Sequence, residues 1–128
     1  MLLDTHALLW LTMDDARLGE RARDRIMHAP RVLYSSVSIS ELVIKHMLGK
    51  IELPGGERFP EIFARSGLVE LPFTARHANA LRDDPTLVRH NPFDRMLIAQ
   101  ARAEGIELLT ADRVLLGLDR QWVHDAAR

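Results

Sequence analysis

The sequence predicts an α/β fold, a three-layer α/β/α sandwich with a central parallel sheet of four to five strands. Two observations lead to this fold class. Short apolar runs alternate with segments of helical periodicity, and no repeat or low-complexity segment interrupts the alternation. A chain of 128 residues also has the usual length of one compact domain, so we expect a single domain over residues 1–128.

The first half of the chain supplies two strands and three helices. The apolar run Met1–Leu3 is typical of a strand and stops at Asp4. Pro30 ends the second helix and Gly49 closes the third, because neither residue favours helix continuation. We expect strands over residues 1–3 and 32–34, and helices over about 6–11, 18–28 and 39–48.

The second half contains the best-defined helix of the chain. Asn91 is a favourable N-cap, Pro92 suits the first helical position and Gly105 stops the helix. The expected elements are a helix over 60–66, a strand over 68–72, a helix capped by Thr74 and reaching about 83, a polar loop over 84–90, a helix over 92–104, a strand over 106–109, a short helix after Asp112 and an edge strand at 122–123.

Composition and charge exclude several classes of protein. There is no cysteine, which excludes disulfide frameworks, thiolate zinc sites and cysteine nucleophiles. No apolar run is long enough to span a bilayer, and the first residues lack the basic leader of a secretory signal. We therefore expect a cytoplasmic protein with no membrane partner. The net charge of −1 argues against coating of nucleic acid by bulk charge, but it allows an enzyme with an acidic site and an arginine-lined rim.

Four acidic residues occupy similar positions in the predicted fold. Asp4 and Asp112 each follow a strand and precede a helix, and we expect Glu41 and Asp94 in the first turn of a helix. In a parallel sheet, the carboxyl ends of the strands and the following helix starts share one edge, where ligands bind. These four carboxylates are therefore expected to converge, although they are spread over more than 100 residues of sequence.

Each acid also has a purely structural interpretation. Ser38 and Glu41 have the spacing of a capping box, and Asp94 in a first turn gains about 0.3–1 kcal/mol from the helix dipole. Asp4 and Asp112 have the positions of N-caps. Taken singly, capping is the better interpretation of each residue. The occurrence of one acid at each of four helix starts on the same edge favours a shared site.

Electrostatics requires a partner for such a cluster. Two carboxylates about 4 Å apart repel by roughly 4 kcal/mol at an effective dielectric constant near 20, so the cluster must take up protons or bind a cation. Ligands that are all oxygen select a hard ion such as Mg²⁺ or Mn²⁺. A metal held in this way polarises phosphodiesters and activates water, so a metal-dependent hydrolase is expected.

Four stretches of the sequence carry recognisable motifs, and together they span almost the whole chain. The stretches are Leu2–Trp10, Ser38–Leu42, Asn91–Ala101 and Leu108–Arg113. In their order and spacing they resemble the PIN-domain ribonucleases, and within them the toxins of VapBC-type toxin–antitoxin pairs. Single motifs of this kind are weak, but the four together are specific.

The resemblance implies a fold, a site and an activity. It implies that Asp4, Glu41, Asp94 and Asp112 surround a Mg²⁺ ion, for which Mn²⁺ would substitute, and that Thr110 supports them. It also implies endonucleolytic cleavage of RNA, often a tRNA or ribosomal RNA, together with a homodimer and a small inhibiting antitoxin of the VapB type. One departure is Asn91, where similar toxins often carry an acid.

Two arginines and the histidines are further candidates. Arg95 and Arg113 each directly follow a proposed metal ligand. Either they bind the phosphate of the substrate, or they are solvent-facing helix residues that form ion pairs with nearby acids. The 6 histidines lack the close spacing of zinc ligands, so we expect no zinc site.

Two rival functions remain open from the sequence. The first is a binding domain without activity, in which the acids only cap helices; metal titration separates it from the nuclease. The second is another phosphoryl-handling α/β enzyme. A receiver domain fits poorly because no lysine occurs after Lys50, and an aspartyl phosphatase fits poorly because His6 stands where its second aspartate belongs.

Overall fold

Five short parallel strands form the centre of the fold. The computed structural model describes residues 1–128, and its sheet has the order β3-β2-β1-β4-β5 with every neighbouring pair parallel. The predicted parallel sheet is confirmed, and the predicted edge strand near the C-terminus is part of it. The strands are β1 (Leu2–Leu3), β2 (Leu33–Ser35), β3 (Val69–Leu71), β4 (Leu108–Thr110) and β5 (Val123–Asp125).

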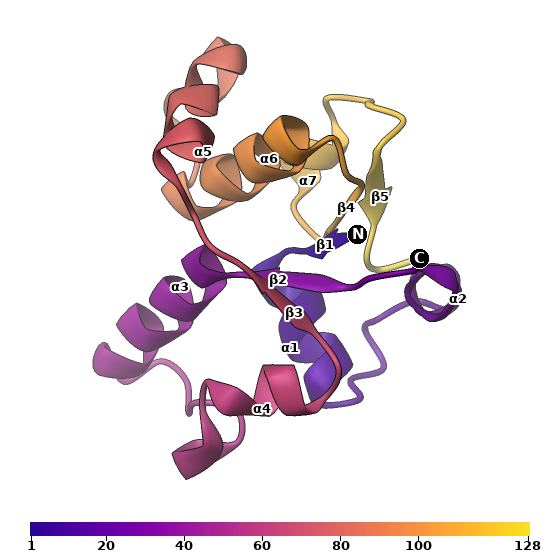
Figure 1. The fold of residues 1–128 in the computed structure, drawn as a ribbon, viewed down its shortest axis with the longest axis vertical. Coiled ribbons are helices and arrows are strands. Elements are labelled where there is room, and N and C mark those ends of the chain that lie inside the picture. Colours follow the sequence, from indigo (N-terminus) through magenta and orange to yellow (C-terminus); the bar gives the residue numbers. More distant parts are fainter.

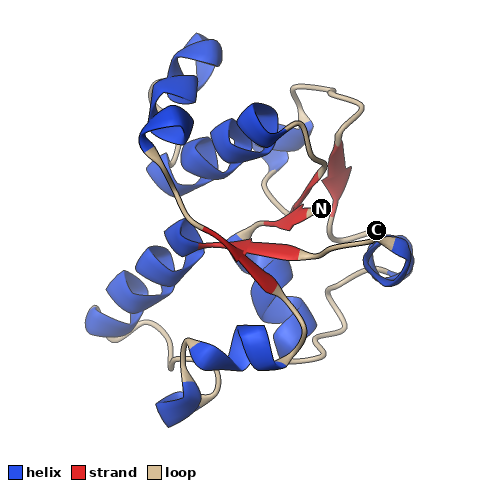
Figure 2. Ribbon diagram, viewed as in Figure 1, coloured by secondary structure: helices blue, strands red, loops and turns tan.

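Helices cover both faces of this sheet, which confirms the three-layer sandwich. In Figure 1, α6 and α7 lie on one side of the strands and α1 and α4 on the other. Figure 2 shows the red strands between blue helices in the same view. None of the helices has the length and apolar character needed to cross a bilayer. The helices are α1 (Thr5–Thr12), α2 (Glu20–His28), α3 (Ser36–Met47), α4 (Glu61–Arg65), α5 (Ala75–Asn79), α6 (Pro92–Glu104) and α7 (Arg113–Leu116), with short 3₁₀ helices at Gly56–Arg58, Ala80–Asp83 and Pro85–Leu87.

Successive residues of the strands point to opposite faces and build two apolar cores. Leu3 and Leu109 pack with residues of α1, α3 and α4, whereas Leu2 and Leu108 pack with residues of α6 and α7. All four leucines are fully buried. A strand that is buried on both faces is apolar throughout, which is why these strands appear in the sequence as continuous apolar runs. The two cores hold the strand ends in place.

The order of the strands reverses between β1 and β4. The chain passes from β1 outward to β2 and β3, then returns to the other side of β1 for β4 and β5. Ligands of open α/β sheets bind outside the carboxyl ends of the strands at such a switch point. Asp4 directly follows β1, and Asp112 lies two residues beyond β4. The topology therefore brings these two residues to the same end of two neighbouring strands, although they are 108 positions apart in sequence.

The start of α3 differs from the predicted one. The helix begins at Ser36, directly after β2, and its N-cap is Ser35, whose hydroxyl accepts a hydrogen bond from the backbone N–H of Val37 at 3.0 Å. The predicted capping box of Ser38 and Glu41 is therefore wrong, and Glu41 lies in the second turn rather than the first. Ser35 takes the cap because the strand ends there, and the later serines continue the helix.

The caps of α6 agree with the prediction. The side chain of Asn91 accepts hydrogen bonds from the backbone N–H groups of Phe93 and Asp94, and Pro92 is the first helical residue. Gly105 ends the helix with φ +64°, a conformation that favours glycine. These two ends fix the register of α6, and with it the position of Asp94 in the first turn.

Candidate metal centre

Asp4 is buried at the junction of β1 and α1. Its Oδ1 accepts a hydrogen bond from the backbone N–H of Ala7 at 2.7 Å, which is the predicted N-cap interaction. Its Oδ2 accepts hydrogen bonds from the Thr110 hydroxyl at 2.7 Å and the backbone N–H of Ala111 at 2.8 Å. Burial raises the pKa of the Asp4 carboxyl, while these three hydrogen bonds act in the opposite direction. The carboxylate is thus held in one orientation beside the end of β4.

Thr110 joins two of the predicted acids. It is the last residue of β4 and fully buried, and its hydroxyl donates to Asp4 while accepting from the backbone N–H of Asp112 at 3.0 Å. Asp112 in turn caps α7, because its Oδ1 accepts from the backbone N–H of Leu115 at 2.9 Å. The structure therefore places the predicted supporting residue between Asp4 and Asp112.

Asp94 experiences the charges of the other three acids. Burial raises the pKa of its carboxyl to about 8, with the negative charge of Asp112 as the next cause and those of Asp4 and Glu41 contributing further. A carboxyl with this pKa carries a proton at neutral pH unless a cation replaces it. The four acids predicted from sequence are thus gathered closely enough for their charges to interact.

Glu41 is a buried residue in the second turn of α3. One turn earlier on this helix, the Ser38 hydroxyl accepts a buried hydrogen bond from the Thr5 hydroxyl at 2.9 Å, which ties α3 to the start of α1. Glu41 Oε2 forms an ion pair with Lys45 Nζ at 2.8 Å. Its Oε1 is buried and has no hydrogen-bond partner. Since an unpartnered buried carboxylate oxygen is costly, this atom calls for a donor or a cation.

His90 belongs to the cluster and was not among the predicted site residues. Its Nε2 lies 3.1 Å from both carboxylate oxygens of Asp112 and 3.6 Å from Asp94 Oδ2. These three side chains have the geometry of a candidate metal-binding group. The spacing of four residues between His90 and Asp94 was visible in the sequence. The proximity to Asp112, which is 22 residues away, is a product of the fold.

The two predicted arginines have other contacts. Arg113 is exposed on α7 and pairs with Asp125 at 3.1 Å, which is the solvent-facing alternative considered above. Arg95 Nη1 donates to the backbone carbonyl of Val88 at 3.1 Å, within the segment that leads to His90. Neither side chain forms an ion pair with the four acids.

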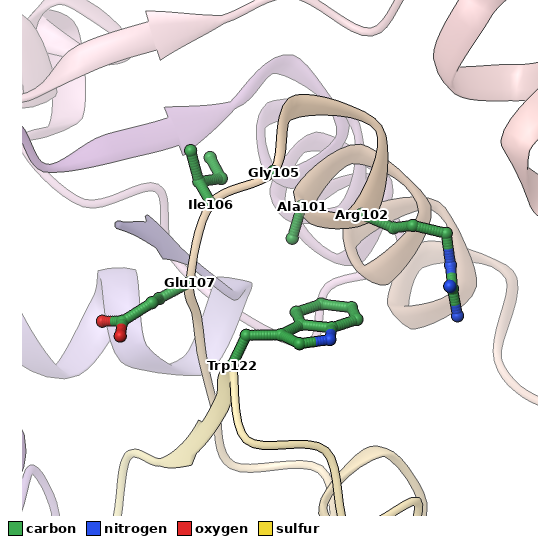
Figure 3. A pocket seen from close by; sticks show the side chains of 6 residues that line it. All are labelled: Ala101, Arg102, Gly105, Ile106, Glu107 and Trp122. Carbon is green, nitrogen blue, oxygen red and sulfur yellow. The ribbon is translucent and has the colours of Figure 1, made fainter.

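A pocket of about 230 Å³ lies away from the acidic cluster. Figure 3 shows the indole of Trp122 lying beneath the end of α6, with Glu107 pointing away from the ring. Residues 105–107 precede β4 and Trp122 precedes β5, so this pocket is at the opposite edge of the sheet from the acids. It contains none of the predicted site residues, and the acidic cluster is the better candidate for chemistry.

Comparison of the sequence with models of protein families identifies the family of this chain. The model of the PIN domain matches residues 1–120, which is nearly the whole chain. The chain belongs to the PIN domain family. A search of curated protein sequences found no match.

Several solved structures share this fold, and one of them is a toxin–antitoxin complex from Klebsiella pneumoniae. VapBC2 from Rickettsia felis, bound to a promoter DNA fragment, matches with a TM-score of 0.68 and 15% identity, covering 97% of this chain and 96% of that chain. DNA-bound VapBC from Salmonella typhimurium matches with a TM-score of 0.64 and 22% identity over 97% and 94% of the two chains. FitAcB from Neisseria gonorrhoeae matches with a TM-score of 0.64 and 18% identity over 98% and 96%. At these identities the likeness concerns the fold of this PIN domain.

Proposed function

We propose that this PIN-domain protein is a metal-dependent endoribonuclease and the toxin of a toxin–antitoxin pair. The observation that carries the proposal is that Asp94 and Asp112 belong to a group of side chains whose candidate ligand atoms all lie within 4.8 Å of one another. The charges of Asp4 and Glu41 contribute to the raised pKa of Asp94, which supports a shared site at the switch point of the sheet. Four carboxylates that serve only as helix caps would not have to share a crevice.

Two features of the cluster fit a divalent cation. The pKa of Asp94 is raised by burial and by neighbouring negative charges, which a cation would compensate, and Glu41 Oε1 is a buried oxygen without a partner. Carboxylate oxygens are the ligands preferred by Mg²⁺ and also suit Mn²⁺. We therefore propose that Asp4, Glu41, Asp94 and Asp112 hold Mg²⁺, and that Mn²⁺ substitutes for it.

The side chains of the cluster have distinct tasks in this proposal. When bound, the divalent ion polarises a phosphodiester and activates water for hydrolysis. Asp4 is immobilised by its three hydrogen bonds, so its carboxyl group keeps one orientation beside the end of β4. The Thr110 hydroxyl links the Asp4 carboxyl to the backbone of Asp112 and so holds the two residues beside each other. Asp94, whose pKa is raised by burial and by the neighbouring carboxylates, would ionise when a cation compensates those charges.

The partners of the proposed toxin follow from the family and from its structural neighbours. The neighbours are described as VapBC or toxin–antitoxin complexes, so we propose a small antitoxin of the VapB type as the inhibitor of this chain. We propose a tRNA or ribosomal RNA as the substrate, with Arg95 as a contact to its phosphates. Exposed apolar residues at the end of α3, which are Ile44, Met47 and Leu48, offer a surface for a homodimer or for the antitoxin.

Incubation of the purified protein with total RNA tests this function. With 5 mM Mg²⁺ or Mn²⁺, a concentration of roughly the order used for weak carboxylate sites, we expect a small set of discrete fragments. Excess EDTA should abolish them, and renewed addition of the ion should restore them. Intact RNA under all conditions, or cleavage that EDTA does not affect, would reject the metal-dependent nuclease.

A further inference from the structure

We infer that His90 is a nitrogen ligand of the ion in the acidic crevice, so that the site prefers transition-metal ions such as Mn²⁺ to Mg²⁺. This inference rests on the proposed metal site and adds a fifth side chain to it. It departs from the all-oxygen ligand set expected from the sequence.

The distances around His90 match those between ligands of one ion. In octahedral coordination at 2.0–2.1 Å, neighbouring ligand atoms are about 3 Å apart and opposite ones about 4 Å apart. His90 Nε2 lies 3.1 Å from Asp112 Oδ2 and 3.6 Å from Asp94 Oδ2. The three candidate donor atoms all lie within 4.8 Å of one another. A single ion can therefore contact all three after small movements of the side chains.

The backbone around His90 holds the imidazole at this place. His90 directly precedes Asn91, the N-cap of α6, so it is one turn before Asp94 on the same side of the helix start. The backbone N–H of His90 donates to the carbonyl of Leu87 at 2.9 Å, and Leu87 is buried in the core. Its side chain is only 19% exposed. The backbone of His90 is thus fixed next to the core, and its ring is mostly shielded from solvent.

An exposed pair elsewhere in the chain provides a contrast. Asp24 and His28 on α2 also lie four residues apart, and their side chains approach to 3.3 Å. Both side chains are about three-quarters exposed, and no further acid joins them in a metal-binding group. His90 is a candidate ligand because it lies beside both Asp94 and Asp112, and not only because it is four residues from an aspartate.

A nitrogen ligand changes the relative affinity of the site for Mn²⁺ and Mg²⁺. Mg²⁺ strongly favours oxygen ligands, whereas imidazole suits the softer ions of the transition series. Replacing His90 by glutamine removes the nitrogen donor but keeps a polar side chain of similar length. Because removal of residues around a metal site usually lowers metal affinity at least tenfold, we expect the affinity for Mn²⁺ to fall about tenfold or more. The affinity for Mg²⁺ should change less than about threefold.

Two measurements on purified full-length protein test this inference. Calorimetric titration gives the affinities for Mn²⁺ and Mg²⁺, and pulsed electron paramagnetic resonance of bound Mn²⁺ detects coupling to a ligand nitrogen. We expect nitrogen coupling in the wild type and in the matched control His28→Gln, and none in His90→Gln.

The outcomes separate the inference from the proposed function. Binding of Mn²⁺ without nitrogen coupling in the wild type, or coupling that persists in His90→Gln and disappears in His6→Gln, overturns the inference and leaves the carboxylate site intact. A higher affinity in His90→Gln also overturns it, because the imidazole would then compete with the ion. A wild type that binds neither ion overturns the proposed metal site as well.

Discussion

Replacing Asp94 by asparagine is expected to abolish RNA cleavage and at the same time to stabilise the protein without metal. Loss of a metal ligand removes several kcal/mol of transition-state stabilisation, so cleavage should fall by about 10³-fold or more. In the absence of metal, the substitution removes a carboxyl that burial and the charge of Asp112 disfavour in its ionised form. We expect a gain of at least about 1 kcal/mol at pH 8, or roughly 4 °C in Tm.

The pH dependence of stability follows from the same carboxyl. The folded-state pKa of about 8 lies above the ordinary value of 3.8, so the folded protein binds more protons than the unfolded chain between these values. Metal-free stability should therefore fall as the pH rises from about 4 to 8, and Asp94→Asn should reduce this slope.

A matched control distinguishes the site from a general effect of removing an acid. Asp24→Asn removes an exposed acid that also lies four residues from a histidine, and it should change neither cleavage nor Tm. Thermal unfolding with and without EDTA and quantitative cleavage assays provide the data. Full cleavage by Asp94→Asn, or a lower metal-free Tm, would contradict the role given to this residue.

Replacing Asp84 by alanine is expected to cause a large loss of stability. Asp84 is buried and pairs with Arg102 at 2.8 Å and with Arg120. Both guanidinium groups also lie over the ring of Trp122, at 5.8 and 5.7 Å from its centroid. Removing one partner of a buried ion pair costs about 3–5 kcal/mol, and because the arginines are partly exposed we expect about 2–3 kcal/mol here.

The effect of Asp84 can be measured by urea unfolding. Burial opposes ionisation of Asp84, but the two arginines outweigh it and hold its pKa below the ordinary value of 3.8. Its contribution should therefore be present above that pH and be lost as the pH falls further through the folded-state value. The neighbouring Asp83 is exposed, so Asp83→Ala should stay within about 0.5 kcal/mol of the wild type. An equally small change in Asp84→Ala would show that the ion pairs contribute nothing.

Asp84 also links the stability of the fold to the candidate site. It begins the segment 84–90, which ends at His90, and its ion pairs anchor the start of that segment to α6 and to Arg120. A variant without these anchors should therefore loosen the position of His90 as well as the fold.

The general position of the acids could be predicted because strand ends are easy to recognise. Asp4 directly follows an apolar run, and the caps of α6 fix Asp94 in the first turn. Once the strands are parallel, such residues share one edge of the sheet. Local sequence patterns are sufficient for this step.

Two features of the site could not be predicted from local patterns. Ser35, Ser36, Ser38 and Ser40 are all suitable helix caps, and only pairing of the strand through Ser35 determines which serine starts α3. The start of the helix decides whether Glu41 is a capping residue or a buried side chain in the second turn. His90 meets Asp112 across the fold, so its place in the cluster depends on how α6 packs beside β4.

The central claim is that distant carboxylates share one divalent ion. Crystals of the wild type grown with Mn²⁺ test it directly, because the anomalous signal of manganese locates the ion without assumptions about its ligands. We expect a single strong peak between the carboxylates of Asp94 and Asp112, within about 2.5 Å of an oxygen from each. An acidic crevice without a manganese peak, in crystals that contain the ion at millimolar concentration, would contradict the account.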